Sequence, residues 1–365
     1  MALFEESVSL NRLLLNLSFL MTKPTGISTY AFNLFPHLKL LNPTLLVSRN
    51  IENFDCYPVP PNLTPEQGTK GNLSRILWTQ LQLPKIYDKL KANLLFSPLP
   101  EAPVFSGCRY VVTVHDLIPL RFPRRFSPLT NYSRYLLPLV LSEAQHIICD
   151  SESTAKDVIK FFHIPERKVT PVLLAYDADR FRFLDLPSRN YFLYIGRHDP
   201  YKNILLLIEA FATLPNSDDR ELWIAGSFDK RFTPTLKAAA EQLGICDRIK
   251  FLEYVPYAEL PTIVNQAIAL VFPSLWEGFG LPVLEAMACG TPVITSNLSS
   301  IPEVAGDAAI LIDPYNVGEI AEAMQAVADD AELRSRLRQA GLARSQQFSW
   351  AKTGQTTATI LQQYL

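Results

Sequence analysis

The sequence predicts an α/β protein with two doubly wound, Rossmann-like domains that face each other across a cleft. Three observations predict this fold class. The chain has 365 residues, which suggests about two domains. Apolar runs of strand length alternate with segments of helical periodicity along the whole chain. The runs are apolar at nearly every position, as expected of parallel strands that helices cover on both faces.

Six strands are expected in each domain, and each is a short apolar run that ends at polar or turn-forming residues. In the first domain they occupy residues 13–19, 44–48, 94–97, 110–115, 146–150 and 169–173. In the second they occupy residues 191–196, 221–225, 249–252, 269–272, 293–295 and 309–312. The segment at 183–190 has the composition of a linker, so we expect domains at residues 1–185 and 186–345.

Helices are expected where apolar residues recur with the period of an amphipathic helix. The first domain has such segments at 27–41, 74–90, 129–142 and 154–162. The second has them at 203–213, 235–243, 257–266, 282–288 and 317–328, and further helices follow at 334–344 and 350–365.

Charge and cysteine usage narrow the function classes. The 34 basic and 36 acidic residues nearly cancel, which argues against a protein that binds nucleic acid by bulk charge. The five cysteines are odd in number and form no C-x-x-C pair, which favours free thiols in a reducing cytoplasm. Glu5 and Glu6 precede the apolar run at 13–21, so a buried strand is expected there rather than a signal peptide. No segment approaches the roughly 18 apolar residues of a membrane span.

Ligands of doubly wound sheets bind at the carboxyl ends of the strands, so the strand-to-helix turns are the places to search. The most informative turn follows the strand at 269–272. Gly278 and Gly280 allow close backbone approach, and a helix start at Pro282 suits an anion such as phosphate. Glu277 and Glu285 flank this turn as acceptors for hydroxyl groups. The plainer alternative is that the glycines only turn the chain and Glu285 only complements the helix dipole.

Two further turns carry groups suited to an anion. Arg197 and Lys202 lie in the turn after the strand at 191–196, where an arginine fork and a lysine point charge suit a diphosphate. Gly26 lies in the turn after the first strand and allows close approach there. The alternative for Arg197 and Lys202 is that both are solvated loop cations, and the alternative for Gly26 is an ordinary turn.

His115 ends an apolar strand of the first domain, and we expect the adjacent Asp116 to orient its ring. A satisfied structural histidine is the alternative. Asp177 and Asp179 form a D-x-D pair, but no other carboxylate or histidine cluster lies near them in the sequence, so no metal site is expected.

An arginine-rich segment of the first domain is interleaved with aromatic residues. Its basic residues are Arg121, Arg124, Arg125 and Arg134, and its aromatic residues include Phe122, Phe126 and Tyr132. It suits an anionic lipid or a diphosphate-linked acceptor, and a solvated face is the alternative.

Taken together, these motifs resemble family 4 of the retaining glycosyltransferases, which have the two-domain GT-B fold. The resemblance rests on an E-x7-E element at 277–285 with its continuation to 293. Gly196-Arg197 with Lys202-Asn203, His115-Asp116 and residues 150–153 resemble family segments too.

The resemblance implies a role for each matching residue. His115 and Glu277 would contact the transferred sugar and form the catalytic pair. Arg197 and Lys202 would bind the donor diphosphate, Glu285 the ribose and Val255 the base, while Gly26 would approach the diphosphate from the first domain. Backbone N–H groups would assist, from Gly278, Phe279, Gly280 and Leu281. The final helix, 346–365, would pack back on the first domain, which would hold the acceptor.

The resemblance also implies the reaction. A hexose would leave a nucleotide diphosphate through an oxocarbenium-like transition state that fixed cations stabilise, with no metal or cofactor. No side chain is an evident nucleophile, so the sequence does not support a covalent double displacement. The resemblance implies front-face attack instead, with the leaving diphosphate taking the acceptor's proton.

Residues 113–119 look most like bacterial polysaccharide mannosyltransferases, so GDP-mannose is the favoured donor and UDP-glucose or another UDP-sugar the alternative. A saccharide or lipid-linked saccharide is the expected acceptor, with peripheral contact at the inner membrane face. A nucleotide-sugar epimerase and a catalytically silent nucleotide-binding protein remain alternatives. A nicotinamide dehydrogenase would need a glycine fingerprint after the first strand, where residues 15–30 supply one glycine.

Overall fold

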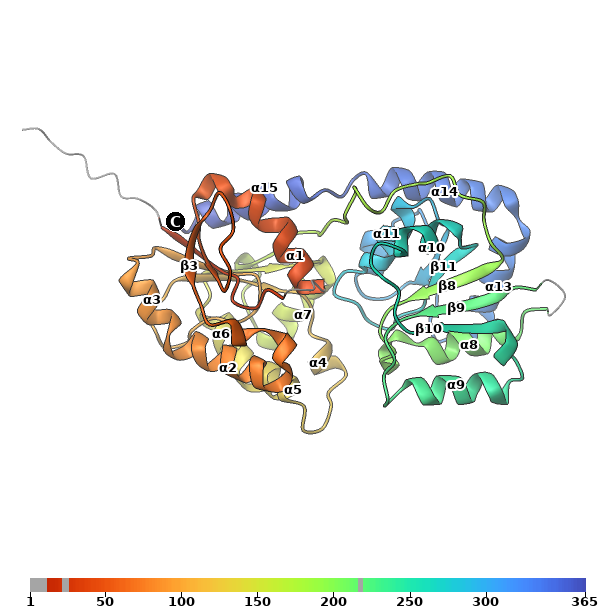
Figure 1. Ribbon diagram of the computed structural model, residues 1–365, viewed down its shortest axis with the longest axis horizontal. Helices are drawn as coiled ribbons and strands as arrows, with labels where there is room; N and C mark the ends of the chain where they lie inside the picture. Colours follow the sequence, from red (N-terminus) through yellow and green to blue (C-terminus); the bar gives the residue numbers. More distant parts are fainter. Residues whose placement is uncertain (1–11, 22–25, 216–218) are drawn as a thin grey trace, which may run out of the picture. The chain divides into compact units, whose positions relative to one another are not determined.

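The computed structural model describes residues 12–21, 26–215 and 219–365 and divides the chain into two compact units (Figure 1). The first unit comprises the described residues up to Asp150, Thr154–Val172 and Trp350–Leu365. The second comprises Ser151–Ser153 and Leu173–Ser349. The chain therefore passes into the second unit at Leu173, ahead of the segment expected as a linker. The expectations for Glu5 and Glu6 lie outside the described residues.

The first unit is built on a parallel sheet of seven strands in the order β3-β2-β1-β4-β5-β6-β7. Its strands are β1 (Leu13–Asn16), β2 (Thr44–Val47), β3 (Asp55–Pro58), β4 (Leu94–Ser97), β5 (Tyr110–Val114), β6 (His146–Cys149) and β7 (Val169–Pro171). Six match expected runs. The seventh, β3, was not expected, because it is an edge strand with no fully buried residue and lacks an apolar run.

Several helices of the first unit are shorter than the periodic segments that predicted them. The segment 27–41 forms α1 (Gly26–Leu34) and a 3₁₀ helix, η1 (Phe35–Leu41). The segment 74–90 lies within α2 (Gly68–Leu81) and α3 (Leu83–Lys89). Pro36 and Pro84 lie at these breaks, because a proline in a helix interior removes a hydrogen bond and clashes with the preceding turn.

The segment 129–142 is also broken. It forms α5 (Pro128–Asn131), a π-helical turn η4 (Tyr132–Leu136) and α6 (Leu137–Glu143). Pro138 lies in the first turn of α6. A short helix, α4 (Ile118–Arg121), precedes this group, and α7 (Glu152–Phe162) follows β6.

The second unit repeats the design with six parallel strands in the order β10-β9-β8-β11-β12-β13. Its strands are β8 (Tyr191–Ile195), β9 (Glu221–Ala225), β10 (Ile249–Leu252), β11 (Ala269–Phe272), β12 (Val293–Ser296) and β13 (Ile310–Ile312). The helices are α8 (Ile204–Ala212), α9 (Thr233–Gln242), α10 (Leu260–Gln266), α11 (Leu281–Ala288), α12 (Ile301–Ala305), α13 (Val317–Asp329) and α14 (Ala331–Ser345). All six strands were expected, and α12 was not.

In each sheet the chain adds strands first toward one edge and then toward the other. The change occurs between β1 and β4 in the first sheet and between β8 and β11 in the second. This is the arrangement of doubly wound folds, so the predicted fold class is confirmed. Ligand sites of such sheets lie at the carboxyl ends of the strands beside the reversal. Among the described residues no helix is both long and apolar enough to cross a membrane.

The last helix, α15 (Trp350–Gln362), belongs to the first unit and packs on α1 and η1. Gly354 makes this contact close, since a Cβ there would lie 2.2 Å from the Cβ of His37. At the end of α15, the hydroxyl of Tyr364 lies 3.0 Å from Nδ1 of His146 in β6. The first unit is therefore completed by residues that follow the whole second unit in the sequence.

Candidate active site

The turn expected to bind an anion lies at the carboxyl edge of the second sheet, where β8, β11 and β12 are neighbours. Three turns meet there, at 196–203, 273–280 and 297–300. The first two are joined directly, because the backbone N–H of Leu275 donates to the carbonyl of Tyr201 at 2.8 Å. The sheet thus brings together Lys202 and the glycine turn, which lie far apart in the sequence.

The glycine turn ends at a residue that must be glycine, and a hydroxyl group supports its backbone. Gly280 has φ +113°, and a Cβ there would lie 2.6 Å from Cδ1 of Ile301, so both backbone conformation and space require glycine. The Ser300 hydroxyl lies 3.0 Å from the carbonyl oxygen of Glu277 and 2.8 Å from that of Phe279. Sequence reasoning missed Ser300, because no motif marks a hydroxyl that supports a neighbouring turn.

Helix α11 begins directly after this turn, at Leu281, with Pro282 as its second residue. No side-chain hydrogen bond caps its first turn within the described part of the chain. The expected sequence of strand, glycine turn and helix start is therefore present.

Lys202 and Glu277 form an ion pair at the turn. The Nζ of Lys202 lies 2.6 Å from Oε1 of Glu277, and the two side chains are 12% and 10% exposed. The ammonium also lies 5.4 Å from the ring centroid of Phe272. An ammonium has three donors, so Lys202 retains donors for an anion while it holds the carboxylate in place.

Arg197 is far more exposed than Lys202 and has a different partner. Its side chain is 70% exposed, and its Nε lies 2.8 Å from Oδ2 of the buried Asp199. The structure therefore anchors this arginine at one atom on the loop that carries Lys202. No described contact joins it to the glycine turn.

Glu285 lies in α11, one helical turn into the helix. Burial, and secondly the charge of Asp177, raise the pKa of this carboxyl to about 8. No described residue hydrogen-bonds to the carboxyl. A half-buried carboxyl without a hydrogen-bond partner among the described residues is suited to accept hydrogen bonds from a ligand's hydroxyl groups.

Asp177, whose charge acts on Glu285, is marked in the sequence only as part of a D-x-D pair. It pairs with Arg180 at 3.3 Å, and the Arg180 guanidinium lies 4.4 Å from the ring centroid of Tyr257. Val255, expected at the base, lies half-buried in the loop after β10. Among the described residues no group of three or more His, Cys, Asp or Glu side chains is arranged to hold a metal ion.

His115 follows β5 in the first unit, and both of its ring nitrogens are engaged. Nδ1 lies 2.7 Å from a carboxylate oxygen of Asp150, and Nε2 lies 2.8 Å from the carbonyl oxygen of Pro98. Burial lowers the pKa of His115, but the charge and hydrogen bonds of its partners outweigh burial, and the net shift is upward. Both partners are acceptors, so the geometry favours an imidazolium that donates at both nitrogens.

The expectation that Asp116 orients this ring is wrong. Oδ1 of Asp116 accepts the backbone N–H of Ile118 at 2.9 Å. The orienting carboxylate is Asp150, because β5 and β6 pair with Val114 opposite Cys149 and so place their following residues side by side.

Gly26 begins α1 in the first unit and is exposed, and a Cβ there would meet no atom within 4 Å. The preceding residues of this turn, 22–25, lie outside the described part of the chain. The role expected of Gly26 therefore stays a prediction.

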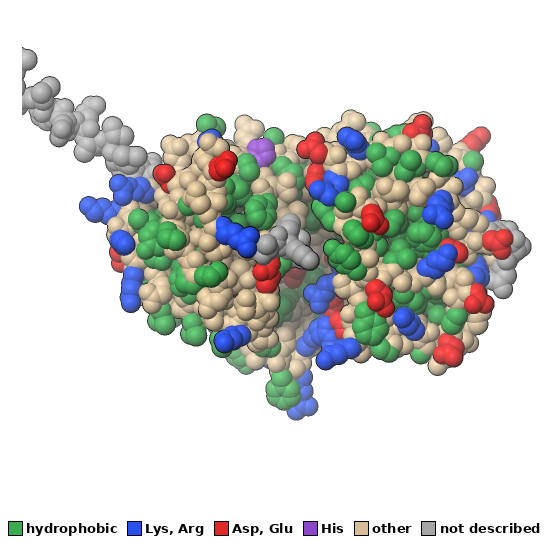
Figure 2. Space-filling view, viewed as in Figure 1, with side chains coloured by type: hydrophobic (Ala, Val, Ile, Leu, Met, Phe, Trp, Pro, Cys, Tyr) green, Lys and Arg blue, Asp and Glu red, His purple; other side chains and the backbone are tan. Residues whose placement is uncertain are grey.

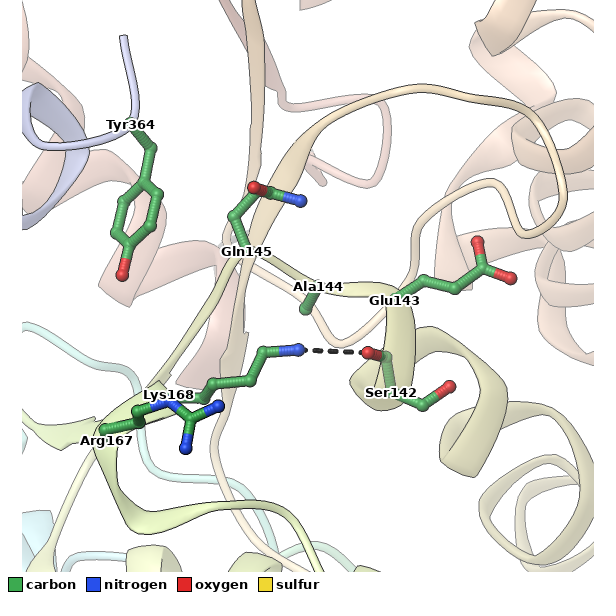
Figure 3. A pocket seen from close by; sticks show the side chains of 7 residues that line it. All are labelled: Ser142, Glu143, Ala144, Gln145, Arg167, Lys168 and Tyr364. Carbon is green, nitrogen blue, oxygen red and sulfur yellow. Dashed lines mark hydrogen bonds between the residues drawn. The ribbon is translucent and has the colours of Figure 1, made fainter.

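A pocket of about 440 Å³ lies at the opposite edge of the first sheet, next to the amino end of β6 (Figure 3). Ser142, Glu143, Ala144, Gln145, Arg167, Lys168 and Tyr364 line it. Lys168 points toward the end of α6, where its Nζ donates to the carbonyl of Ser142 at 2.9 Å, while Glu143 points away. Lys168 thus stabilises a helix end, and the pocket is separate from the edge that carries His115.

Two family models match the chain. The model described as "Glycosyl transferases group 1" matches residues 176–344, and that described as "Glycosyltransferase Family 4" matches residues 24–180. Among curated relatives, the O-antigen chain mannosyltransferase B of Escherichia coli is 33% identical over 267 residues, which are 69% of each chain. The serotype-specific mannosyltransferase WbdA of Escherichia coli is 30% identical over 67% of this chain, which spans 32% of the WbdA chain.

Solved structures of similar fold have low sequence identity. The Anabaena protein HepE, in complex with UDP and glucose, has a TM-score of 0.74 at 18% identity and covers 96% of this chain and 99% of its own. Sucrose-phosphate synthase from Thermosynechococcus elongatus also has a TM-score of 0.74 at 18% identity, with 97% and 98% covered. These likenesses establish the fold. The chain belongs to glycosyltransferase family 4, and it is a hexosyltransferase with the GT-B fold of two Rossmann-like domains.

Proposed function

We propose that the chain transfers mannose from GDP-mannose, with retention of configuration, to a saccharide or lipid-linked saccharide in polysaccharide synthesis. The observation that carries the proposal is the Lys202–Glu277 pair on a glycine turn that opens a helix. The O-antigen mannosyltransferase relatives support mannose. A UDP-sugar is the second candidate, because the similar HepE structures contain UDP and UDP-glucose.

The developing charge in this reaction lies on the leaving diphosphate. Lys202 and the start of α11 are fixed before the donor binds, so they can stabilise that charge without reorganisation. Arg197, which pairs with Asp199 through Nε, supplies a second cation from the same loop. We therefore expect these groups to stabilise the leaving diphosphate without a metal ion.

Glu277 would hold the sugar. Its Oε1 accepts from Lys202, whereas Oε2 has no hydrogen-bond partner among the described residues and can accept a hydroxyl of the hexose. Lys202 therefore has two roles, since the ammonium that attracts the diphosphate also fixes the carboxylate that orients the sugar.

His115 has no free lone pair in this geometry, because both nitrogens donate to acceptors. It therefore cannot act as a general base. We assign it the contribution of a fixed positive charge in the first unit, and the acceptor's proton goes to the leaving diphosphate. This division agrees with front-face attack.

The donor is tested by thermal unfolding in the presence of GDP, UDP, ADP, GDP-mannose, UDP-glucose or NAD, because a ligand of the folded state raises the melting temperature. Selective stabilisation by GDP and GDP-mannose supports the proposal. Selective stabilisation by UDP and UDP-glucose would show that the donor is a UDP-sugar and not GDP-mannose. A response to NAD alone would contradict the nucleotide-sugar site.

Two variants test the residue roles. Lys202→Ala should weaken nucleotide diphosphate binding about tenfold or more, since a hydrogen bond to a charged group contributes about 1.5–3 kcal/mol. Glu277→Ala should retain this binding but lose turnover by orders of magnitude. Lys250→Ala, which removes an exposed lysine paired with Glu221, is the matched control. Unchanged affinity in Lys202→Ala, or normal transfer by Glu277→Ala, would refute the assignment.

A further inference from the structure

The pocket next to β6 is lined by three segments that lie far apart in the sequence (Figure 3). Residues 142–145 lead from α6 into β6, the 3₁₀ helix η5 (Glu166–Lys168) leads into β7, and Tyr364 follows α15. All of these residues belong to the first unit. The volume of about 440 Å³ lies within the range of small-molecule sites, and the lining side chains are polar apart from Ala144. The pocket therefore suits a small polar ligand better than an acyl chain.

Two adjacent cations line this pocket and retain unused donors. Arg167 is exposed, and within the described part of the chain its guanidinium has no hydrogen bond or ion pair. The Nζ of Lys168 donates to the carbonyl oxygen of Ser142 at 2.9 Å. An ammonium has three donors, so Lys168 keeps two for a ligand, and Arg167 keeps all of its own.

The positive charge of the pocket is not neutralised by a carboxylate among the described residues. Glu143 lines the pocket, but it accepts the backbone N–H of Phe105 at 3.1 Å and points away. Its neighbour Glu166 does not line the pocket. Burial, and secondly the charge of Arg167, lower the pKa of Lys168, and a bound anion would relieve this repulsion. The second unit differs, because basic and acidic side chains lie among one another on the face shown in Figure 2.

A hydroxyl group and an amide complete the lining. The hydroxyl of Tyr364 lies 3.0 Å from Nδ1 of His146, whose Nε2 lies 2.8 Å from the hydroxyl of Thr170. Burial and the charge of Lys168 lower the pKa of His146, so the ring is neutral at neutral pH. With its proton on Nδ1, the ring donates to the Tyr364 oxygen and leaves the phenolic O–H to donate to a ligand. Gln145 adds an amide that can both donate and accept.

We propose that this pocket binds a small phosphate monoester that also carries hydroxyl groups. Two adjacent cations suit a dianion, and a phosphate monoester carries a charge of about −1.5 to −2 at pH 7, whereas a carboxylate carries one. The Arg167 fork and the Lys168 point charge suit the phosphate oxygens. Gln145 and Tyr364 suit the hydroxyl groups. The site lies at the opposite edge of the first sheet from His115 and does not depend on the proposed transfer reaction.

The test is isothermal titration calorimetry of the full chain with glucose 6-phosphate, inorganic phosphate, glucuronate and glucose. Glucose 6-phosphate should bind most tightly. Inorganic phosphate lacks the hydroxyl groups and glucuronate carries a single charge, so each should bind at least about tenfold more weakly, and glucose should not bind. In NMR, glucose 6-phosphate should shift the ring signal of His146 but not that of His198 in the second unit. Binding of glucose 6-phosphate no tighter than that of glucose or of inorganic phosphate would overturn the proposal.

Matched variants test whether the ligand occupies this pocket. Arg167→Gln should lower the affinity for glucose 6-phosphate at least about tenfold, and Tyr364→Phe should lower it as well. Arg49→Gln, at an exposed arginine just beyond the carboxyl end of β2, should leave it unchanged. Arg167 and Arg49 are both exposed, so these two variants should melt as the parent does.

The donor site is the competing location for a phosphate. Lys202→Ala should retain the binding of glucose 6-phosphate, and neither GDP nor UDP should compete with it. Unchanged affinity in Arg167→Gln would overturn the proposal. So would loss of binding in Lys202→Ala together with competition by a nucleotide, because the phosphate would then occupy the donor site.

Discussion

Glu285 makes a quantitative prediction about pH and stability. Burial and the charge of Asp177 raise its pKa from 4.5 to about 8 in the folded protein, so the folded chain holds this carboxyl protonated at neutral pH while the unfolded chain does not. A raised pKa means that the stability contribution is complete below about pH 4.5 and is lost as the pH rises through about 8.

The magnitude follows from the shift. A pKa unit corresponds to about 1.36 kcal/mol, so the full difference of about 3.5 units corresponds to about 5 kcal/mol. Between about pH 5 and about pH 8.5 the change is about 4 kcal/mol. Glu285 is partly exposed, so solvent screening makes this an upper limit. The glutamine in Glu285→Gln cannot titrate, so this variant should not lose this stability as the pH rises.

The assay is calorimetric unfolding of the parent and of Glu285→Gln across this pH range. The two proteins should have similar free energies of unfolding near pH 5. Above pH 5 the parent should lose stability relative to the variant, so the difference between them should grow with pH. Asp177→Asn removes the charge that is the second cause of the raised pKa of Glu285. Because burial remains, this variant should weaken the pH dependence only in part. Parallel pH profiles for the parent and Glu285→Gln would refute the reasoning.

Three further predictions concern single contacts. Asp150→Asn removes the charge that raises the pKa of His115, so NMR titration should show the ring losing its proton at lower pH, and an unchanged midpoint would contradict the imidazolium. Ser300→Ala removes the one hydroxyl hydrogen that two carbonyls of the glycine turn share, which should cost about 1–2 kcal/mol of stability and weaken nucleotide diphosphate binding. Unchanged calorimetry would show that other contacts hold the turn. Tyr364→Phe loses the hydrogen bond to His146, so unfolding should become easier by about 1 kcal/mol while nucleotide binding is kept, and weaker binding would show that the effect is not confined to the first unit.

The sequence predicted the central strands well because they are buried on both faces and therefore apolar at every position. β5 and β11 are buried throughout and were found with nearly correct bounds. The edge strand β3 was missed, because its exposed and half-buried residues, Asp55–Pro58, carry no such signal. The long helices were wrong where a proline interrupts otherwise continuous helical periodicity.

The candidate site was predictable to the extent that its residues belong to local motifs. The glycine turn with its two glutamates is contiguous in the sequence and stands out without structural information. Partners supplied by neighbouring strands were not predictable. The sequence favours the neighbouring Asp116 as the partner of His115, whereas the partner is Asp150, which directly follows the adjacent strand β6. Ser300 was missed for the same reason, because its relation to the turn arises from the pairing of β11 with β12.

The placement of α15 has a consequence for biosynthesis. Translation delivers the strands of the first unit early, but the helix that packs on α1 and η1 emerges from the ribosome only after the entire second unit. Domains of nascent chains generally fold as units in the order of their synthesis. Here the second unit can reach its final form first, while the earlier one waits with the binding surface for α15 uncovered, including the place beside His37 that Gly354 will occupy. Chaperone engagement during translation should therefore concentrate on the amino-terminal half, and ribosome stalling ahead of Trp350 should prolong it.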